Sequence, residues 1–277
     1  MQPSHLADTV SSKPQTLKFI ILVYSIIDLL RQLTMSTTVV LISGANQGLG
    51  FECVKKLAAE QPNYHILLGS RNAQRGTDAA AKVTKLAPGS QVEPIQLDIT
   101  DDESIAKAAK YVEDKFGRLD VLFNNAAISK APGKSFRDEM NEILNTNTTS
   151  AACMTEAFLP LLKKAPVPRL VFMSSGLGSA AHTLDPTTPF HGWIFKAYAA
   201  SKAAMNLLGV SYAVLHGKEG IKVNMIDPGY RSTNINGFSE TGGKAEDGAL
   251  QACKIIVNTD EDGPHASFTN IDGVVPW

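Results

Sequence analysis

A glycine-rich turn between an apolar run and a helical stretch limits the fold of this chain more than any other feature. The run is Val39-Val-Leu-Ile42, and the stretch after the turn, Phe51-Glu-Cys-Val-Lys-Lys-Leu-Ala-Ala59, has helical periodicity. A strand, a tight loop and a helix in that order direct several backbone N–H groups and the positive end of the helix dipole at one point, which suits a pyrophosphate. Gly44, Gly48 and Gly50 are spaced G-x-x-x-G-x-G and allow a turn, close phosphate approach and tight helix packing. The same glycines could also serve the turn alone.

Apolar runs of strand length alternate with helical stretches from Val39 onward. The expected strands are residues 39–42, 65–68, 92–97, 121–123, 170–173 and 222–226. The expected helices are residues 49–59, 74–86, 102–116, 137–163 and 198–216. With 277 residues, 44% of them hydrophobic, the chain can bury one sizeable core. We therefore expect a single-domain α/β fold with a doubly wound, Rossmann-like parallel sheet, which binds ligands at the carboxyl ends of its strands.

The composition narrows the classes of function. Lys and Arg number 26 against 27 Asp and Glu, so the charge does not favour a nucleic-acid partner or an anionic membrane surface. Cys53, Cys153 and Cys253 are far apart and lack the close spacing of a metal site or a disulfide scaffold. We therefore expect no metal ion and a reducing, cytoplasmic location.

The first part of the chain differs from the rest. We expect residues 1–36 to be an N-terminal extension and residues 37–277 to be a nucleotide-binding domain. Residues 17–33 are apolar but contain Lys18, Asp28 and Arg31, and they fall short of the ~20 apolar residues that a membrane-spanning helix needs. Three interpretations are open: an added amphipathic helix, a weak membrane anchor, or residues upstream of the true start. The third is favoured, because the residues after Met35 begin a strand as a free-standing domain would.

The end of the second expected strand indicates which nicotinamide cofactor the chain prefers. Leu68-Gly-Ser-Arg71 lies about twenty residues past the glycine turn, where NAD-binding folds place an acid for the ribose 2′-hydroxyl. Ser70 and Arg71 stand there instead, and a guanidinium can pair bidentately with a 2′-phosphate. We therefore expect NADP(H), the alternative being that Arg71 is an ordinary solvated charge.

Polar side chains also end the next two expected strands. Asp98 could accept a hydrogen bond from an adenine amino group or cap a helix, although Thr100 and Asp101 are better placed for capping. Asn124 and Asn125 end the fourth strand, where two amides can fix the sheet and the cofactor together. Taken alone, these asparagines could also be plain turn residues.

The clearest catalytic signal is Tyr198-Ala-Ala-Ser-Lys202. At positions i and i+4 of a helix, the phenol and the ammonium share one face within reach of a common ligand. Because a nearby cation favours the phenolate, we expect Lys202 to lower the pKa of Tyr198 toward a range useful for proton transfer. Ser175, after the strand 170–173, is expected to face the same crevice. The pattern Y-x-x-x-K is weak by itself, and its value comes from the order of the motifs at strand ends and helix starts.

Together these motifs resemble the short-chain dehydrogenase/reductase family over about residues 37–277. The matching residues are Ser43-Gly-Ala-Asn-Gln-Gly-Leu-Gly50, Asn124-Asn-Ala-Ala127, Asn147, Ser175, Tyr198, Lys202 and Asp227-Pro-Gly229. Ser70-Arg71, Gly248-Ala-Leu250 and the ending from Asp262-Gly-Pro-His-Ala-Ser-Phe268 to Trp277 are similar to the carbonyl-reductase-like branch. The resemblance implies an NADPH-dependent oxidoreductase that reduces a ketone or aldehyde, with a small-molecule carbonyl substrate as its partner.

The resemblance also implies the roles of the site residues. Hydride would pass from the nicotinamide to the carbonyl carbon, Tyr198 would protonate the oxygen, and Ser175 would orient it. Lys202 would hold the ribose hydroxyls. Asn147, chosen over Asn145 by its following Thr-Thr-Ser, would hold a water that relays protons, or it could be a structural amide. The implied cofactor-binding residues are Gly44, Asn46, Gln47, Gly48, Leu49, Gly50, Ser70, Arg71, Asp98, Ile99, Asn125, Ala126, Tyr198, Lys202, Pro228, Gly229 and Thr233.

Several segments depart from the family pattern. Ser43 replaces the common Thr and keeps the hydroxyl, and Ala127 replaces a usual Gly. Residues 179–197 form a long insert that contains Phe190, Trp193 and Phe195. This insert could fold over the substrate mouth and contact a bulky ketone, or it could be a surface loop packed on its own apolar residues. Residues 234–247, rich in Gly, Ser and Thr, are expected to form a mobile substrate-binding loop.

A non-catalytic protein that senses NADP(H) as a regulator or scaffold is the alternative function. Such a protein needs only the glycine turn, Arg71 and the cleft, whereas this chain also keeps Ser175, Tyr198 and Lys202, which favours an enzyme. The natural substrate, the direction of reaction and the choice between a monomer and a homo-oligomer stay open.

Overall fold

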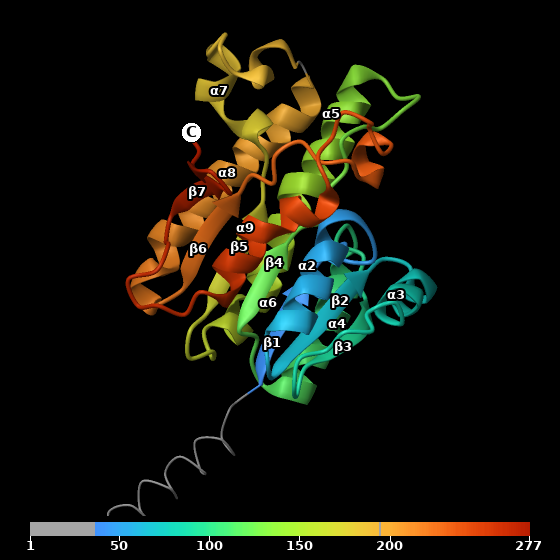
Figure 1. The fold of residues 1–277 in the computed structure, drawn as a ribbon, viewed down its shortest axis with the longest axis vertical. Coiled ribbons are helices and arrows are strands. Elements are labelled where there is room, and N and C mark those ends of the chain that lie inside the picture. The colour runs from blue at the N-terminus through green and yellow to red at the C-terminus, as the bar shows by residue number, and fades with distance from the viewer. Residues whose placement is uncertain (1–36, 194) are drawn as a thin grey trace, which may run out of the picture. The chain divides into compact units, whose positions relative to one another are not determined.

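An eight-stranded sheet forms the centre of the fold in the computed structural model, which describes residues 37–193 and 195–277. The strands are β1 (Thr38–Ile42), β2 (Tyr64–Ser70), β3 (Gln91–Gln96), β4 (Val121–Asn124), β5 (Arg169–Met173), β6 (Lys222–Ile226), β7 (Ser267–Asn270) and β8 (Gly273–Val274). They lie in the order β3-β2-β1-β4-β5-β6-β7-β8, and neighbours are parallel except for β7 and β8. The order reverses between β1 and β4 (Figure 1), which places a ligand crevice at their carboxyl ends.

Helices cover both faces of this sheet. They are α2 (Gly48–Glu60), α3 (Ala73–Ala80), α4 (Asp102–Phe116), α5 (Phe136–Leu144), α6 (Ser150–Leu162), α7 (Ala180–Leu184), α8 (Lys196–His216) and α9 (Ala245–Val257). Val39 and Leu41 belong to the core that α4, α6 and α8 cover, whereas Val40 and Ile42 belong to the core under α2, α3 and α9. Because both faces of β1 are buried, its sequence is a continuous apolar run rather than an alternating one.

The expected doubly wound, Rossmann-like α/β fold is confirmed, and each of the six expected strands is present. The helix expected at residues 74–86 is wrong in extent, since α3 ends at Ala80. Lys82 N donates to Ala79 O (3.0 Å), so this bond spans three residues and not the four of an α-helix. Ala87 N donates to Ala58 O of α2 (2.7 Å). These bonds lead the chain back toward β3 and stop the helix.

The single helix expected at residues 137–163 is also wrong, because a π-helical turn at Asn145–Thr149 separates α5 from α6. Ser150 donates both its backbone N–H and its hydroxyl (2.9 Å) to the carbonyl oxygen of Asn145. A carbonyl that accepts from the fifth residue along widens the turn, and such turns are frequent at functional sites.

Two features bear on the remaining expectations. Within residues 37–193 and 195–277, no helix has the length and apolar character to cross a membrane. In the same residues, no group of three or more His, Cys, Asp or Glu could hold a metal ion. The expected extension, residues 1–36, lies outside the described residues.

Candidate active site

The glycine turn between β1 and α2 needs glycine for two physical reasons. Gly44 and Gly48 have positive φ angles of 62° and 58°, which side chains disfavour. A Cβ on Gly44 would lie 2.8 Å from the Cβ of Ala126, and a Cβ on Gly50 would lie 2.5 Å from the Nδ2 atom of Asn125. The three glycines therefore keep their own side chains out of this turn, as close approach of a phosphate to its backbone requires.

Ser43 and Asn125 hold this turn against the end of β4. The Ser43 hydroxyl accepts hydrogen bonds from the backbone N–H groups of Asn125 (3.0 Å) and Ala126 (3.1 Å). In return, the Asn125 amide donates to the carbonyl oxygens of Ser43 (2.8 Å) and Gly44 (3.2 Å). Asn124 donates to a threonine hydroxyl of α6 (3.1 Å). Ser43 and Asn125 thus fix the glycine turn to the end of β4, and Asn124 fixes that strand end to α6.

A hollow beside the glycine turn carries two arginines. Its lining residues are Asn46, Gln47, Ser70, Arg71, Asn72 and Arg75. Arg71 follows β2, and Arg75 lies in the first turn of α3, where its backbone N–H donates to the capping side chain of Asn72 (2.9 Å). Buried Ser70 donates its hydroxyl to Asn72 O (2.8 Å). Asn72 and Arg75 were not among the expected site residues, although an asparagine N-cap three residues before an arginine could have indicated them.

Asp98 and Ile99, the residues expected to contact the adenine side of the cofactor, do not line this hollow. Asp98 Oδ1 accepts from the backbone N–H (3.0 Å) and the hydroxyl (2.7 Å) of Thr100. Asp101, not Asp98, caps α4, as its position suggested. The adenine contact of Asp98 and the cofactor contact of the buried residue Ile99 stay predictions.

A pocket of about 330 Å³ opens at the carboxyl ends of β1, β4, β5 and β6. It brings together the predicted residues Gly44, Asn46, Gln47, Gly48, Leu49, Asn125, Ala126, Ser175, Tyr198, Lys202, Pro228, Gly229 and Thr233. Gly50, Asp98, Ile99 and Asn147 do not line it. Residues that the sequence analysis did not assign to the site also line it, among them Ser129, Lys130, Tyr230 and Arg231.

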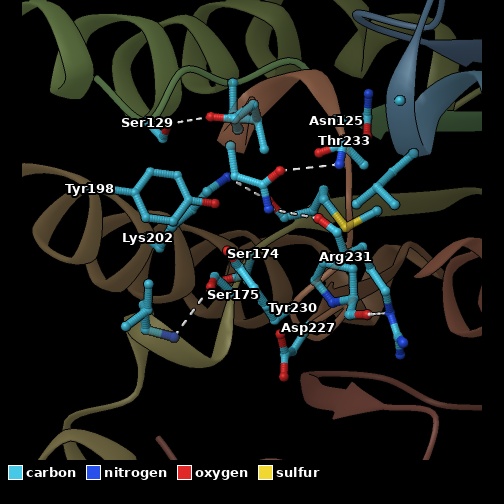
Figure 2. Close-up of a pocket in the computed structure, with 18 of the residues that line it drawn as sticks. Asn125, Ser129, Ser174, Ser175, Tyr198, Lys202, Asp227, Tyr230, Arg231 and Thr233 are labelled. Atoms are coloured by element: carbon cyan, nitrogen blue, oxygen red, sulfur yellow. Dashed lines mark hydrogen bonds between the residues drawn. The ribbon is translucent and has the colours of Figure 1, made fainter. Parts of the chain in front are cut away.

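Tyr198 and Lys202 lie one turn apart on α8, and Ser175 faces them from the end of β5 (Figure 2). The Ser175 hydroxyl accepts from Leu177 N (3.2 Å) and shares a hydrogen bond with the Tyr198 phenol. The Lys202 ammonium lies 5.6 Å from the centre of the Tyr198 ring and donates to Met173 O (2.7 Å). One pocket therefore holds a phenol, a hydroxyl and an amine within reach of one small ligand.

The protonation of these groups differs from the expectation. Burial, and then the carboxylate of Asp227, raise the pKa of the Tyr198 phenol, while the hydrogen bond from Ser175 opposes them. Burial lowers the pKa of Lys202 to about 7, because the charged ammonium is removed from water. The expected lowering of the Tyr198 pKa by Lys202 is therefore wrong for the described residues. Tyr198 is held protonated, the form that can donate a proton.

Asn147 is completely buried in the π-helical turn, and its side chain is fully engaged. Its Oδ1 accepts from Ile128 N (2.9 Å), and its Nδ2 donates to Ile128 O (2.9 Å) and to the Ser201 hydroxyl (2.9 Å). Ser201 in turn donates to Tyr198 O (2.7 Å). Asn147 therefore ties the loop after β4 to the first turn of α8, and its water-holding role stays a prediction.

The segment after β6 closes the other side of the pocket. Asp227 accepts from Gly229 N (3.0 Å), which fixes the Pro-Gly turn, and Thr233 is buried at the start of the turn Asn234–Asn236. Ser129 donates its hydroxyl to Ile235 O (2.7 Å) across the pocket. The expected loop 234–247 is shorter than predicted, since α9 begins at Ala245.

The insert 179–197 contributes α7 and a 3₁₀ turn at Pro189–Gly192. Phe190, Trp193 and Phe195 from this insert line the pocket. Phe190 also packs on His182 and Trp193 of the same insert, so both interpretations find contacts, and contact with a bulky ketone stays a prediction.

Comparison with known proteins places this architecture in a family. Residues 38–242 match the family described as short chain dehydrogenase, and the chain belongs to it. Short-chain dehydrogenase anuI of Penicillium roqueforti is 37% identical over 230 residues, covering 81% of this chain and 88% of that protein. Short-chain dehydrogenase/reductase eupG of a Phoma species is 36% identical, covering 77% of this chain and 84% of that protein. The chain is therefore an oxidoreductase of the short-chain dehydrogenase/reductase class.

Solved structures agree with this assignment. An NADPH-bound carbonyl reductase from chicken fatty liver superimposes with a TM-score of 0.72 at 26% identity, covering 87% of this chain and 95% of that one. The RhlG/NADP complex of Pseudomonas aeruginosa has the same fold, with a TM-score of 0.72 at 22% identity over 86% of this chain and 96% of its own. The expected family and its likeness to carbonyl reductases are confirmed.

Proposed function

We propose that residues 37–277 form an NADPH-dependent reductase that converts a ketone or aldehyde to an alcohol. The observation that carries the proposal is the convergence of Ser175, Tyr198 and Lys202 on a pocket that is continuous with the glycine turn. The relatives and structures of the same class, one of them an NADPH-bound carbonyl reductase, support it.

The residues fit a dinucleotide with a 2′-phosphate. Side-chain-free backbone at Gly44 and Gly48 suits the pyrophosphate, and Arg71 and Arg75 border a hollow that suits the 2′-phosphate. Pro228, Gly229 and Thr233 line the same pocket, and in this proposal they contact the nicotinamide. When bound, a reduced nicotinamide supplies the hydride that reduces a carbonyl carbon.

In the proposed mechanism, the chain's own groups act on the carbonyl oxygen. Tyr198 donates its phenolic proton to this oxygen, and Ser175 orients the oxygen by hydrogen bonding. Lys202 holds the ribose hydroxyls and stabilises the phenolate that proton transfer leaves. Asn147 keeps the first turn of α8 in place through Ser201.

The cysteines bear on the location of the protein, and the proton donor separates the reductase from the alternative function. The three cysteines are unpaired, which supports a reducing compartment such as the cytoplasm. A sensor of NADP(H) would need the nucleotide site but not the proton donor.

Loss of NADPH absorbance with a panel of ketones and aldehydes tests the proposal, with Tyr198→Phe as the matched variant. Turnover by the wild type that Tyr198→Phe lacks, at unchanged NADPH affinity, is the expected result. Tight NADPH binding without turnover of any carbonyl would favour the sensor.

A further inference from the structure

An aromatic wall lines the pocket beside Ser175, and it begins with Phe190. A Cβ on Gly176 would lie 2.5 Å from Cζ of Phe190, so the phenyl ring packs directly on the backbone that follows Ser175. On its other side, Phe190 stacks on His182, with ring centres 5.1 Å apart and planes 4° apart. The ring is thus fixed against the serine that orients the carbonyl in the proposed mechanism.

Trp193 joins this ring to the far side of the pocket. Its indole meets Phe190 edge to face at 6.2 Å and 81°, and it meets Tyr230 at 4.7 Å and 70°. Tyr230 comes from the Pro-Gly turn after β6, a different segment of the chain, and it remains 37% exposed. Two rings at a steep angle form a corner in which a flat ligand ring can stack on one face and receive the edge of the other.

Internal hydrogen bonds hold the insert in this shape. Thr188 donates its hydroxyl to His182 O (2.7 Å), His191 Nδ1 lies 2.9 Å from Thr183 O, and Ala181 N donates to Trp277 O (3.0 Å). The aromatic corner is therefore prearranged, and a ligand need not pay the full cost of ordering it.

Three charged groups that line the pocket are engaged by backbone atoms. Lys202 donates to Met173 O, Arg231 Nε donates to Pro228 O (2.7 Å), and Asp227 accepts from Gly229 N. In the proposed mechanism, the hydroxyls of Tyr198 and Ser175 are the groups that contact a ligand carbonyl. An apolar, aromatic body with one carbonyl group matches this distribution.

We propose that the substrate is an aromatic ketone or aldehyde and that Trp193 and Tyr230 determine this specificity by contacting its ring. The inference rests on the proposed reductase function and names the substrate class of the same site. It adds two specificity-determining residues from separate segments, the insert and the turn after β6.

The first test compares 2-acetylnaphthalene with its fully saturated counterpart, which has the same carbon skeleton without an aromatic face. We expect the wild type to prefer the aromatic ketone in kcat/KM by roughly three- to tenfold, the range that aromatic pairing contributes. Trp193→Leu and Tyr230→Leu should each remove most of this preference, mainly through KM, at unchanged NADPH affinity. Phe136→Leu is the matched control, since Phe136 is an exposed aromatic residue on α5 (60%) that does not line the pocket.

The second test needs no turnover. The protein has two tryptophans, so a Trp277→Phe variant leaves Trp193 as the reporter of its fluorescence. With NADP⁺ bound, the aromatic ketone should quench this emission at lower concentration than the saturated ketone.

The outcomes separate the two proposals. Equal kcat/KM for both ketones, or an equal loss for both in Trp193→Leu, overturns the aromatic specificity and leaves the reductase standing. Absence of turnover with either ketone, together with selective quenching of Trp193, overturns the reductase and supports the aromatic site.

Discussion

Replacing Lys202 by methionine should remove a pH-dependent cost that the folded wild type carries. The ammonium is 1% exposed and is held by one backbone carbonyl, and burial lowers its pKa from 10.5 to about 7. Between these two values the unfolded chain binds the proton and the folded chain does not. The free energy of unfolding of the wild type therefore rises with pH across this window, and the gain is lost as the pH falls toward 7.

The size of the effect follows from the pKa. Each pH unit above the folded pKa is worth about 1.4 kcal/mol, so the interval from pH 7 to pH 9 contributes roughly 2–3 kcal/mol. Methionine has a similar length and no proton to bind. The difference in the free energy of unfolding between wild type and Lys202→Met should therefore move by roughly 2–3 kcal/mol from pH 6 to pH 9, in favour of the wild type at high pH.

Urea unfolding at pH 6, 7, 8 and 9, without added nucleotide, measures this difference. Lys107→Met is the matched control, because Lys107 lies on the exposed side of α4 and pairs with Glu103. Its difference from wild type should not change with pH. A difference for Lys202→Met that is as flat as the control would refute the argument that burial lowers the Lys202 pKa.

Two further sets of variants test the nucleotide hollow and the buried amide. Arg71→Ala and Arg75→Ala should each weaken NADPH binding by about tenfold and leave NADH binding unchanged, because a charge-assisted bond to a phosphate contributes about 1.5 kcal/mol. Calorimetric titration with both nucleotides checks this, and an equal loss for both would speak against a 2′-phosphate site. Asn147→Ala should lower the free energy of unfolding by about 2–3 kcal/mol, since it leaves both backbone groups of Ile128 without their partner. Urea unfolding measures it beside the exposed control Asn145→Ala, and a loss no larger than that control's would show that the amide is not structural.

The parts of the fold that could be predicted from the sequence are those in which burial determines the pattern of apolar residues along a short segment. β1 is buried on both faces, so its sequence is an unbroken apolar run. The turn after it requires glycine at specific positions, and the sequence has glycine there. In contrast, β7 has the sequence Ser-Phe-Thr-Asn and only Phe268 is buried in it. It is a strand because it pairs with β6, and this long-range contact cannot be predicted from the residues of β7 alone.

The candidate site divides in the same way. The residues at strand ends, such as Asn125 and Ser175, were predictable because parallel strands end at one edge of the sheet. Arg75 was missed because it reaches the hollow only through the start of α3 at Asn72, although the asparagine three residues before it was a usable signal of that helix start. Tyr230 joined the pocket through a contact with Trp193, 37 positions earlier in the chain, that no local spacing encodes.

The protonation of Tyr198 and Lys202 depends on burial more than on their spacing. A separation of four residues puts both side chains on one face of α8, and that much the sequence could predict. The sequence could not predict that the Lys202 ammonium would donate to Met173 O, or that the surrounding residues would exclude water from both groups. Exclusion of water disfavours charge on either group, so it raises the pKa of the phenol and lowers that of the amine together. One cause, burial, therefore moves the two pKa values in opposite directions, and no spacing in the sequence reports it.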